Sequence, residues 1–445
     1  MTLLLLAAAL LLAALSVERV RLDRARAAVP LRVVATGTRG KTTVARLLAS
    51  VLREDGRTVL AKTTGSEPCL VLPDGSVERI RRRGPASILE QKALLHRAAR
   101  LRSDAVVAEI MSIHAENHMV EGRRILVPHL VLATNFLVDH TEAQGDTPED
   151  VGSVLALAVP EGATVLTPEG SCPAAFRSAV AAAGATLVEV PAGDYASGAP
   201  PRPAPFPTFP ENVALVVAAA RHLGVGDDVI RRGIARARHD VGALGVWRVP
   251  SGSGGERAAS AGAPGVPTPC VHLVNAFAAN DPAATVRVYE QVMEELASFP
   301  GLPEGGMPPS GPAGARHARC VGLLSLRADR GDRTLQWADA LAAGLLERFD
   351  ALLVTGLHAP ALERRLRHAR AGRRAGPEAE PAEAATIVPV RVLRRSSAEE
   401  MTRAALSEVG PSGGIVFGFG NIGGPGLELV AHWSSTGEVV VAHGY

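Results

Sequence analysis

The most constraining stretch of the chain is a glycine-bearing turn between a strand-like run and a helix-like run. The turn follows the β-branched run 31–35, precedes the helix-patterned segment 44–52, and reads Thr36-Gly37-Thr38-Arg39-Gly40-Lys41-Thr42-Thr43. Strand, tight turn and helix N-terminus in this order bring backbone N–H groups together around a phosphate. A lysine here would meet the β- and γ-phosphates, and the following threonine hydroxyl would ligate Mg²⁺.

The glycine spacing of this turn is shorter than in the usual phosphate loop. Ala35 stands where the pattern G-x-x-x-x-G-K-[ST] has its first glycine, and Gly37 lies three residues before Gly40. A chance glycine turn before a helix is the alternative interpretation. The complete order of strand, turn, Lys, Thr and helix disfavours it, so we expect a nucleotide site.

Several of the strands that follow also end in polar residues. The strand 57–61 runs into Lys62-Thr63-Thr64-Gly65, the strand 105–109 ends in Glu109, and the strand 129–135 is followed by Asp139 and His140. A strand, a helix and a second strand of these lengths form a βαβ unit, which predicts a parallel sheet. Ligands bind at the carboxyl ends of such strands, and an acid there is well placed to hold Mg²⁺. Ordinary polar loop residues are the alternative.

An arginine triplet, Arg81-Arg82-Arg83-Gly84-Pro85, precedes a helix-like stretch at 87–101. A solvated turn is the commoner explanation for such a charge run. Its position before a helix, on the ligand side of the sheet, raises a second explanation, in which the arginines bind a carboxylate-rich substrate.

The composition excludes several classes of function. The chain has 445 residues, 47% of them hydrophobic and 21% charged, which suits two or three folded domains. A formal net charge of +2 gives no reason to expect nucleic acid. Lys41, Lys62 and Lys92 are the only lysines, and the four cysteines are scattered without zinc or disulfide spacing.

The first 17 residues are uncharged and consist almost wholly of Leu and Ala. As a helix they would reach roughly 25 Å, slightly less than a membrane span. Arg19, Arg21, Arg24 and Arg26 follow directly and would keep the downstream chain in the cytoplasm. We expect a membrane anchor at 1–17, with a buried core helix as the alternative.

The rest of the chain predicts two α/β domains. The first spans 28–245 and includes a helix that begins near Asn212, after the Pro-rich segment 191–210. The Gly-, Ser- and Pro-rich segment 250–269 separates it from a second domain at 268–445. In that domain the strand 270–275 ends in Asn275, and the strand 321–326 ends in the segment 327–333.

The phosphate loop, Glu109, the segment 134–140, Asn212 and the segment 275–282 together resemble Mur ligases and folylpolyglutamate synthases. The N-terminal anchor, the segment 62–65, the arginine triplet, the segment 327–331 and the segment 418–422 resemble more closely the ligase subunits of poly-γ-glutamate (capsule) synthases. The resemblance implies a phosphate-loop parallel-sheet central domain of the Mur ligase type and a smaller Rossmann-like C-terminal α/β domain.

The resemblance also implies an activity, namely ATP-dependent ligation of glutamate to a growing poly-γ-glutamate chain through an acyl phosphate. The partners implied are membrane-embedded synthase and export subunits, and the cofactor is Mg²⁺, or Mn²⁺ in its place. The residues expected to act in catalysis are Lys41, Thr42, Glu109, His140 and Arg39, with Thr42, Glu109 and His140 holding metal. ATP is expected to contact residues 36–43, Asn212 and Asn275. Substrate is expected to contact Lys62, Thr63, Thr64, Arg81, Arg82, Arg83, Arg327 and Arg330.

Two departures from the family pattern leave questions open. Mur ligases commonly use a carbamylated lysine after the Asp139-His140 segment, whereas this chain has no lysine beyond Lys92. The family's Asp-His-Leu-Asp pattern becomes Asp139-His140-Thr141-Glu142. The alternative functions are another glutamate-adding ligase of this fold, a membrane-tethered NTPase that powers polymer export, and a non-catalytic scaffold.

Overall fold

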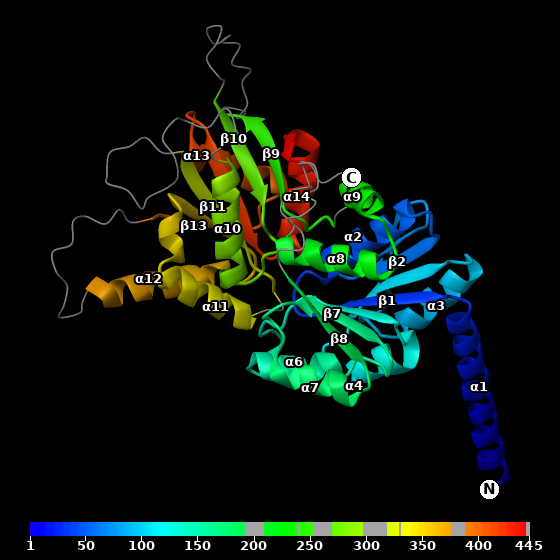
Figure 1. Cartoon of the computed structure of the whole chain (residues 1–445). Coiled ribbons are helices and arrows are strands. Elements are labelled where there is room, and N and C mark those ends of the chain that lie inside the picture. The colour runs from blue at the N-terminus through cyan, green and yellow to red at the C-terminus, as the bar shows by residue number, and fades with distance from the viewer. Residues whose placement is uncertain are drawn as a thin grey trace. The chain divides into compact units, whose positions relative to one another are not determined.

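In the computed structural model the chain forms two compact units, Met1–Asp240 and Val241–His443. The structure describes residues 1–191, 209–238, 240–251, 269–296, 318–328, 331–374 and 388–441. Most of the segments 191–210, 250–269 and 300–314, expected from their composition to be loops or insertions, lies outside the described residues. Each unit contains a β-sheet with helices packed on it (Figure 1).

The sheet of the first unit has eight strands in the order β4-β3-β2-β5-β1-β6-β7-β8. The parallel strands are β1 (Leu31–Thr36), β2 (Val59–Thr63), β5 (Ala105–Glu109), β6 (Leu130–Ala133), β7 (Thr164–Pro168) and β8 (Thr186–Val190). The short strands β3 (Cys69–Val71) and β4 (Val77–Arg79) pair antiparallel at one edge, which the sequence did not predict. Because β5 and β6 flank β1 on opposite sides, the end of β1 lies at a topological switch point, where ligands of such sheets bind.

Helices cover both faces of this sheet (Figure 1). One face packs against α2 (Lys41–Glu54), α8 (Pro210–His222) and α9 (Asp227–Ala235), and the other against α3 (Glu90–Arg100), α6 (Pro148–Ala156) and α7 (Ala174–Ala182). Within β1, Val33 belongs to the first of these cores and Val34 to the second, as the alternation of a strand requires. The expected parallel sheet with helices on it is confirmed.

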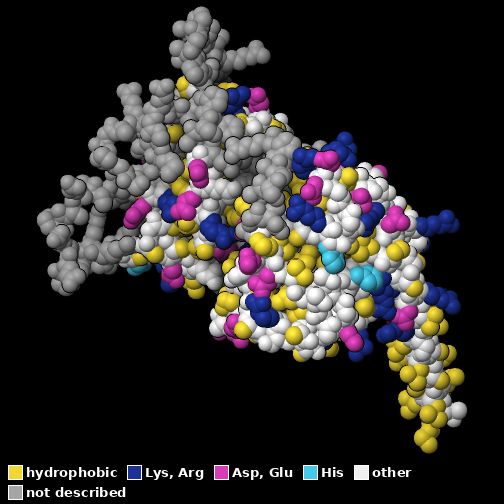
Figure 2. All heavy atoms as spheres, viewed as in Figure 1, with side chains coloured by type: hydrophobic (Ala, Val, Ile, Leu, Met, Phe, Trp, Pro, Cys, Tyr) yellow, Lys and Arg dark blue, Asp and Glu magenta, His cyan; other side chains and the backbone are white. Residues whose placement is uncertain are grey.

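The N-terminal helix α1 is longer than the apolar segment that predicted it, and runs from Thr2 to Ala27. By length and composition it can cross a membrane, and the window of 18 residues that qualifies it is wholly exposed. Its final turns pack on the first unit, because Leu22 and Ala25 are buried and Glu18 pairs with Lys92 of α3. Figure 2 shows apolar side chains along most of α1 and Lys and Arg side chains near its junction with the unit.

A rare element follows β5 in the first unit. The short helix α4 (Ala115–Met119) continues directly into a π-helix, η1 (Val120–Leu126). Single π-turns of this kind are uncommon and occur often at functional sites. The short helix α5 (Thr141–Gln144) follows β6.

The second unit has a sheet of seven strands in the order β13-β12-β11-β14-β10-β9-β15. The parallel strands are β10 (Cys270–Asn275), β11 (Arg319–Ser325), β12 (Ala351–Thr355), β13 (Val390–Leu393) and β14 (Gly414–Gly420). The antiparallel edge consists of β9 (Gly245–Pro250) and β15 (Glu438–Val441), which the sequence did not predict. The helices are α10 (Pro282–Leu296), α11 (Gly331–Ala342), α12 (Ala359–Arg374), α13 (Ala398–Val409) and α14 (Pro425–Thr436). The domain ranges 28–245 and 268–445 stay a prediction. Strand β9 precedes residue 268 in the chain but pairs with β10 in the sheet of the second unit.

Candidate active site

The loop after β1 takes a conformation that requires its glycines. Gly37 and Gly40 have φ angles of +118° and +80°, which lie in the region that glycine adopts without strain. A Cβ atom at Gly37 would lie 2.2 Å from the Thr134 hydroxyl oxygen, and one at Gly40 would lie 2.7 Å from the Asn212 Nδ2 atom. The helix α2 begins at Lys41, directly after Gly40, so its free backbone N–H groups face the loop. This is the geometry that binds an anion at a helix N-terminus.

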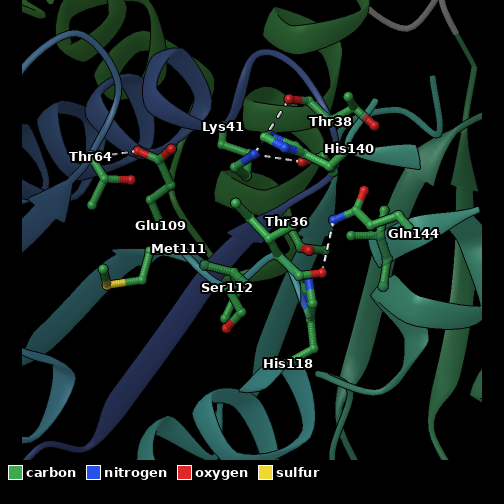
Figure 3. Close-up of a pocket in the computed structure, with 14 residues that line it drawn as sticks. Thr36, Thr38, Lys41, Thr64, Glu109, Met111, Ser112, His118, His140 and Gln144 are labelled. Carbon is green, nitrogen blue, oxygen red and sulfur yellow. Dashed lines mark hydrogen bonds between the residues drawn. The ribbon is translucent and has the colours of Figure 1, made fainter. Parts of the chain in front are cut away.

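A cavity of about 160 Å³ opens beside this loop at the carboxyl edge of the sheet (Figure 3). Seven of its lining residues were expected from the sequence to lie at this edge: Thr36, Gly37, Thr38, Lys41, Thr64, Glu109 and His140. The structure therefore brings most of the predicted phosphate and metal residues of the first unit to one place.

Glu109, the last residue of β5, is held by hydrogen bonds from two neighbouring residues. One carboxylate oxygen, Oε2, accepts hydrogen bonds from the Thr42 hydroxyl and from the Thr64 backbone N–H, both at 2.8 Å. The side chain is 4% exposed. Register explains the meeting, since Glu109 lies opposite Ala35 of β1, one residue before the phosphate loop.

Lys41 folds back onto the loop that precedes it. Its Nζ donates to the carbonyl oxygens of Gly37 at 2.6 Å and Thr38 at 3.4 Å. Burial lowers the pKa of Lys41, and the negative charge of Glu109 opposes that shift. A cation so placed can turn from the two carbonyl groups to a phosphate oxygen in the cavity.

Arg39 and His140 are organised by Asp139. Arg39 forms an ion pair with Asp139 at 3.2 Å, and the backbone N–H of His140 donates to the same carboxylate at 2.9 Å. The amide of Asn135 exchanges two hydrogen bonds with the Arg39 backbone. His140 has a φ of +51°, a left-handed conformation that few residues other than glycine adopt. The loop after β6 is thus built onto the phosphate loop.

Lys62, expected to contact substrate, lies behind the cavity wall. It is 1% exposed, its Nζ is 3.2 Å from Glu90 and 3.4 Å from the Met111 sulfur, and Met111 lines the cavity. Arg82 forms two hydrogen bonds to Glu90, at 2.8 and 3.1 Å. Burial lowers the pKa of Lys62, with the charge of Glu90 opposing. The partial burial of Glu90 favours its neutral form, but Arg82 and Lys62 lower its pKa overall.

The remaining predicted residues of the first unit do not line the cavity. Thr43 is in the first turn of α2, Thr63 is buried with its hydroxyl 3.1 Å from the Cys69 sulfur, and Arg81 and Arg83 are exposed. Asn212, at the start of α8, presses its side chain against Gly40 and is 4% exposed.

Two predicted residues of the second unit are described and one is not. Asn275 is fully buried, and its Nδ2 donates to the carbonyl oxygens of Val241 at 3.2 Å and Ala243 at 2.8 Å. Arg327 lies at the end of β11 and lines a small cavity with Asn421. Arg330 lies outside the described residues.

Several cavity residues were not found from the sequence, and His118, Ser112 and Gln144 are the polar ones. Ser112 belongs to a wall that Glu121 of the π-helix holds in place. The buried Glu121 carboxylate accepts from the backbone N–H groups of Met111 and Ser112, from the Ser112 hydroxyl and from Gln91. No motif or periodic pattern marks these residues, because Glu109 is followed by the mostly apolar Ile110-Met111-Ser112-Ile113.

The oxygen donors beside the phosphate loop fit a divalent cation. Thr42 and Glu109 supply a hydroxyl and a carboxylate next to the place of a bound phosphate, which suits Mg²⁺. Among the described residues, no three His, Cys, Asp or Glu side chains converge as a complete metal site. A cation here would therefore take its remaining ligands from phosphate oxygens and water, as Mg²⁺ commonly does.

Comparison with known proteins assigns the two parts of the chain. Residues 35–154 match the family model described as the Mur ligase middle domain, and with the fold this defines an enzyme of the ATP-dependent amide ligase class. Residues 267–436 match the poly-gamma-glutamate synthase CapB C-terminal domain, so the sequence-based recognition of the poly-γ-glutamate synthase family is confirmed.

Two relatives extend this similarity along the chain. The chain is 27% identical over 341 residues to the PGA synthase CapB of Bacillus subtilis (strain 168), covering 76% of this chain and 78% of that protein. It is 27% identical over 312 residues to the capsule biosynthesis protein CapB of Bacillus anthracis, covering 70% of this chain and 60% of that protein.

Solved structures share the fold. E. coli FolC in complex with DHPP and ADP superposes with a TM-score of 0.59 at 17% identity, over 94% of this chain and 91% of that one. The bifunctional folylpolyglutamate synthase/dihydrofolate synthase of Yersinia pestis, complexed with AMPPNP and a Mn ion, gives a TM-score of 0.61 at 16% identity, over 93% and 92%. The expected fold class, a Mur-ligase-type α/β protein, is confirmed.

Proposed function

We propose that this chain is an ATP-dependent ligase that joins glutamate units into poly-γ-glutamate. The observation that carries the proposal is the presence of Lys41 and Glu109 at one cavity beside the phosphate loop, with the Thr42 hydroxyl bonded to Glu109. The similarity to two proteins named for poly-γ-glutamate and capsule synthesis supports glutamate as the unit that is joined.

The proposed reaction proceeds in two steps. A carboxylate oxygen of the growing chain attacks the γ-phosphorus of ATP, the bond to the β-phosphate oxygen breaks, and ADP leaves. The amine of the incoming glutamate then attacks the acyl phosphate carbonyl, loses a proton, and displaces phosphate. Lys41 would leave the Gly37 and Thr38 carbonyls to stabilise charge on the transferred phosphoryl group.

Thr42 and Glu109 would hold Mg²⁺ or Mn²⁺ beside the phosphates, and His140 would face the same cavity from the loop after β6. The cation, when bound, offsets the repulsion between the carboxylate and the triphosphate. Thr64 keeps the Glu109 carboxylate oriented through its backbone N–H, independently of the metal.

The other predicted contacts complete the proposal. ATP would rest on residues 36–43, with Arg39 held by Asp139 and with Asn212 under Gly40. The polyanionic substrate would meet Arg81, Arg82, Arg83 and Thr64, since guanidinium groups bind carboxylates in pairs of hydrogen bonds. Lys62 and Thr63 are buried behind this surface, and Lys62 would act through its ion pair with Glu90. The contacts expected at Asn275, Arg327 and Arg330 of the second unit stay predictions. We also propose that α1 anchors the enzyme in the cell membrane beside membrane-embedded partner subunits, with the ligase in the cytoplasm.

The test is phosphate release by the full-length chain in detergent or membranes. We expect phosphate to appear from ATP only when both glutamate and a poly-γ-glutamate acceptor are present, together with lengthening of the acceptor. Release of phosphate at the same rate without any acceptor would favour an NTPase instead.

A Glu109→Gln variant separates the metal role from folding. We expect glutamate-dependent phosphate release to fall about 100-fold and the affinity for Mn²⁺ with a non-hydrolysable ATP analogue to fall with it, because the site loses a charged ligand. Glu78→Gln is the matched control, since Glu78 also accepts two hydrogen bonds, from Arg97, but is exposed on β4. Unchanged Mn²⁺ affinity in Glu109→Gln would remove Glu109 from the metal site.

A further inference from the structure

His118 lines the cavity, and the chemistry above gives it no role. The side chain is 1% exposed, yet neither ring nitrogen makes a hydrogen bond of regular geometry within the protein. Buried polar groups in folded proteins are nearly always paired, because a buried donor without a partner destabilises the fold. An imidazole left in this state at the wall of a binding cavity is available to a ligand.

The position of His118 is fixed by the rare element that follows it. It is the fourth residue of α4, which continues into the π-helix, and Glu121 of that π-helix ties the segment to the wall at Met111 and Ser112. Figure 3 shows His118 and Lys41 on opposite sides of Thr36. The cavity thus has a cationic side at the phosphate loop and a second polar side at His118 and Ser112.

His118 is uncharged at neutral pH. Burial, and to a smaller extent the charge of Lys41, lower its pKa to about 4, against a weak opposing contact with the Ser112 backbone. A neutral imidazole carries one N–H donor. Among the described residues, His118 does not belong to a group of three His, Cys, Asp or Glu side chains that could hold a metal ion.

We propose that His118 donates a hydrogen bond to the carboxylate of the acceptor chain that receives the phosphoryl group from ATP. This inference rests on the proposed ligase function. The attacking carboxylate must approach the γ-phosphorus from the side opposite the leaving ADP, and ADP lies on the phosphate loop. His118 occupies the cavity on the side of Thr36 away from Lys41. A neutral donor orients the carboxylate without pairing its charge, so the oxygen remains nucleophilic.

Kinetics of three variants test the inference. His118→Leu removes the donor, His118→Gln restores an N–H group, and His272→Leu is the matched control. His272 is also 1% exposed with a pKa lowered to about 4 by burial, but it lies in β10 of the second unit. We expect His118→Leu to raise the KM for a short poly-γ-glutamate acceptor at least tenfold, with the KM for ATP changed less than twofold. His118→Gln should recover part of this loss, and His272→Leu should leave both KM values unchanged.

A second measurement does not depend on turnover and observes the wild-type protein, with the conservative His118→Gln variant needed only for assignment. In wild-type protein with ¹⁵N-labelled histidine, the ring signals of His118 are assigned by their absence in His118→Gln. We expect them to shift when the acceptor is added together with a non-hydrolysable ATP analogue, while calorimetry records acceptor binding. Acceptor binding that leaves these signals in place overturns the role of His118. A loss of Mn²⁺ affinity in His118→Leu, with acceptor affinity kept, also overturns it. Absence of acceptor binding and of acceptor-dependent phosphate release in the wild type would instead overturn the proposed function.

Discussion

The two units contain the same kind of parallel sheet but use the carboxyl ends of their strands differently. In the first unit, Glu109 and Lys41 turn toward a cavity of about 160 Å³ beside a glycine loop. In the second unit, Asn275 ends β10 in the corresponding way, but its amide donates to the backbone of residues 241 and 243 and accepts from Phe277. Glu109 and Lys41 therefore face a space that a ligand can fill, whereas the Asn275 amide is joined to the backbone.

The buried histidines repeat this contrast. His118 and His272 share 1% exposure and a pKa lowered to about 4. His118 lies at the cavity, whereas His272 lies within β10 between β9 and β14. We therefore expect a buried polar residue to bind a ligand only where its atoms face a space that the ligand can fill.

The largest effect is expected at Lys41. A Lys41→Met substitution should lower glutamate-dependent phosphate release at least 1,000-fold, because about 4 kcal/mol of stabilisation of the transferring phosphoryl group is lost. The free energy of unfolding should not fall, since the substitution removes a cation whose burial is unfavourable. Lys92→Met is the control, because Lys92 pairs with Glu18 on the surface. Activity within tenfold of wild type would break the assignment of the first unit as the catalytic one.

The sequence predicted the elements whose signals are local. The phosphate loop, the parallel strands and the polar residues at their ends all follow from residues adjacent in the chain, and the structure assembles Thr42, Thr64 and Glu109 as that pattern implies. The length of α1 was underestimated because the prediction followed hydropathy, whereas Arg, Glu and Leu continue a helix readily.

The cavity wall at Met111 and Ser112 could not be predicted, because it depends on contacts between residues that are distant in the chain. The π-helix has no propensity signal, and Glu121 is held by Gln91, thirty positions earlier in the chain. Lys62 was expected to face substrate, and only the folded structure shows Glu90 and Met111 around its amine. The strands β3 and β4 have three residues each, too few for an alternating pattern to be recognised.

The change of the free energy of unfolding with pH should depend on the buried His272. The folded-state pKa of His272 is about 4, below the ordinary 6.5, so between these values only the unfolded state takes up a proton. Stability is therefore present above pH 6.5 and is lost as the pH falls toward 4, by up to about 3 kcal/mol. All three tryptophans, Trp247, Trp337 and Trp433, lie in the second unit, so their fluorescence during urea unfolding reports that unit alone.

His272→Leu should flatten this dependence in the fluorescence transition, whereas His118→Leu should leave it unchanged. The first unit requires a separate probe, such as hydrogen exchange of amides in β1 and β5. An unchanged slope in His272→Leu would show that His272 is charged or exposed in the folded second unit.

Substitutions at Asn275 and Asn212 compare an amide that stabilises the second unit with an amide that supports the phosphate loop. Asn275→Ala should lower the free energy of unfolding of the second unit by ~1–3 kcal/mol, because two buried carbonyl groups lose their donor. Asn212→Ala should have a smaller effect on stability and should weaken ATP binding several-fold, since its side chain supports Gly40 of the phosphate loop. Tryptophan fluorescence and calorimetry with an ATP analogue measure the two quantities. A large loss of ATP affinity with full stability in Asn275→Ala would reverse our view of the second unit.

The smallest effect is expected within the arginine triplet, where the same contrast exists between neighbours. Arg82 is engaged with Glu90, whereas Arg81 and Arg83 are exposed and make no ion pair among the described residues. The double substitution Arg81→Gln/Arg83→Gln should raise the KM for a long poly-γ-glutamate acceptor about three- to fivefold at low salt. Stability should not change, since both side chains are exposed. High salt should remove the difference, because it screens exposed charges. Arg82→Gln serves as the comparison, and an equal, salt-independent effect from it would mean that the triplet acts through the Lys62–Glu90 network and not through direct contact with the polymer.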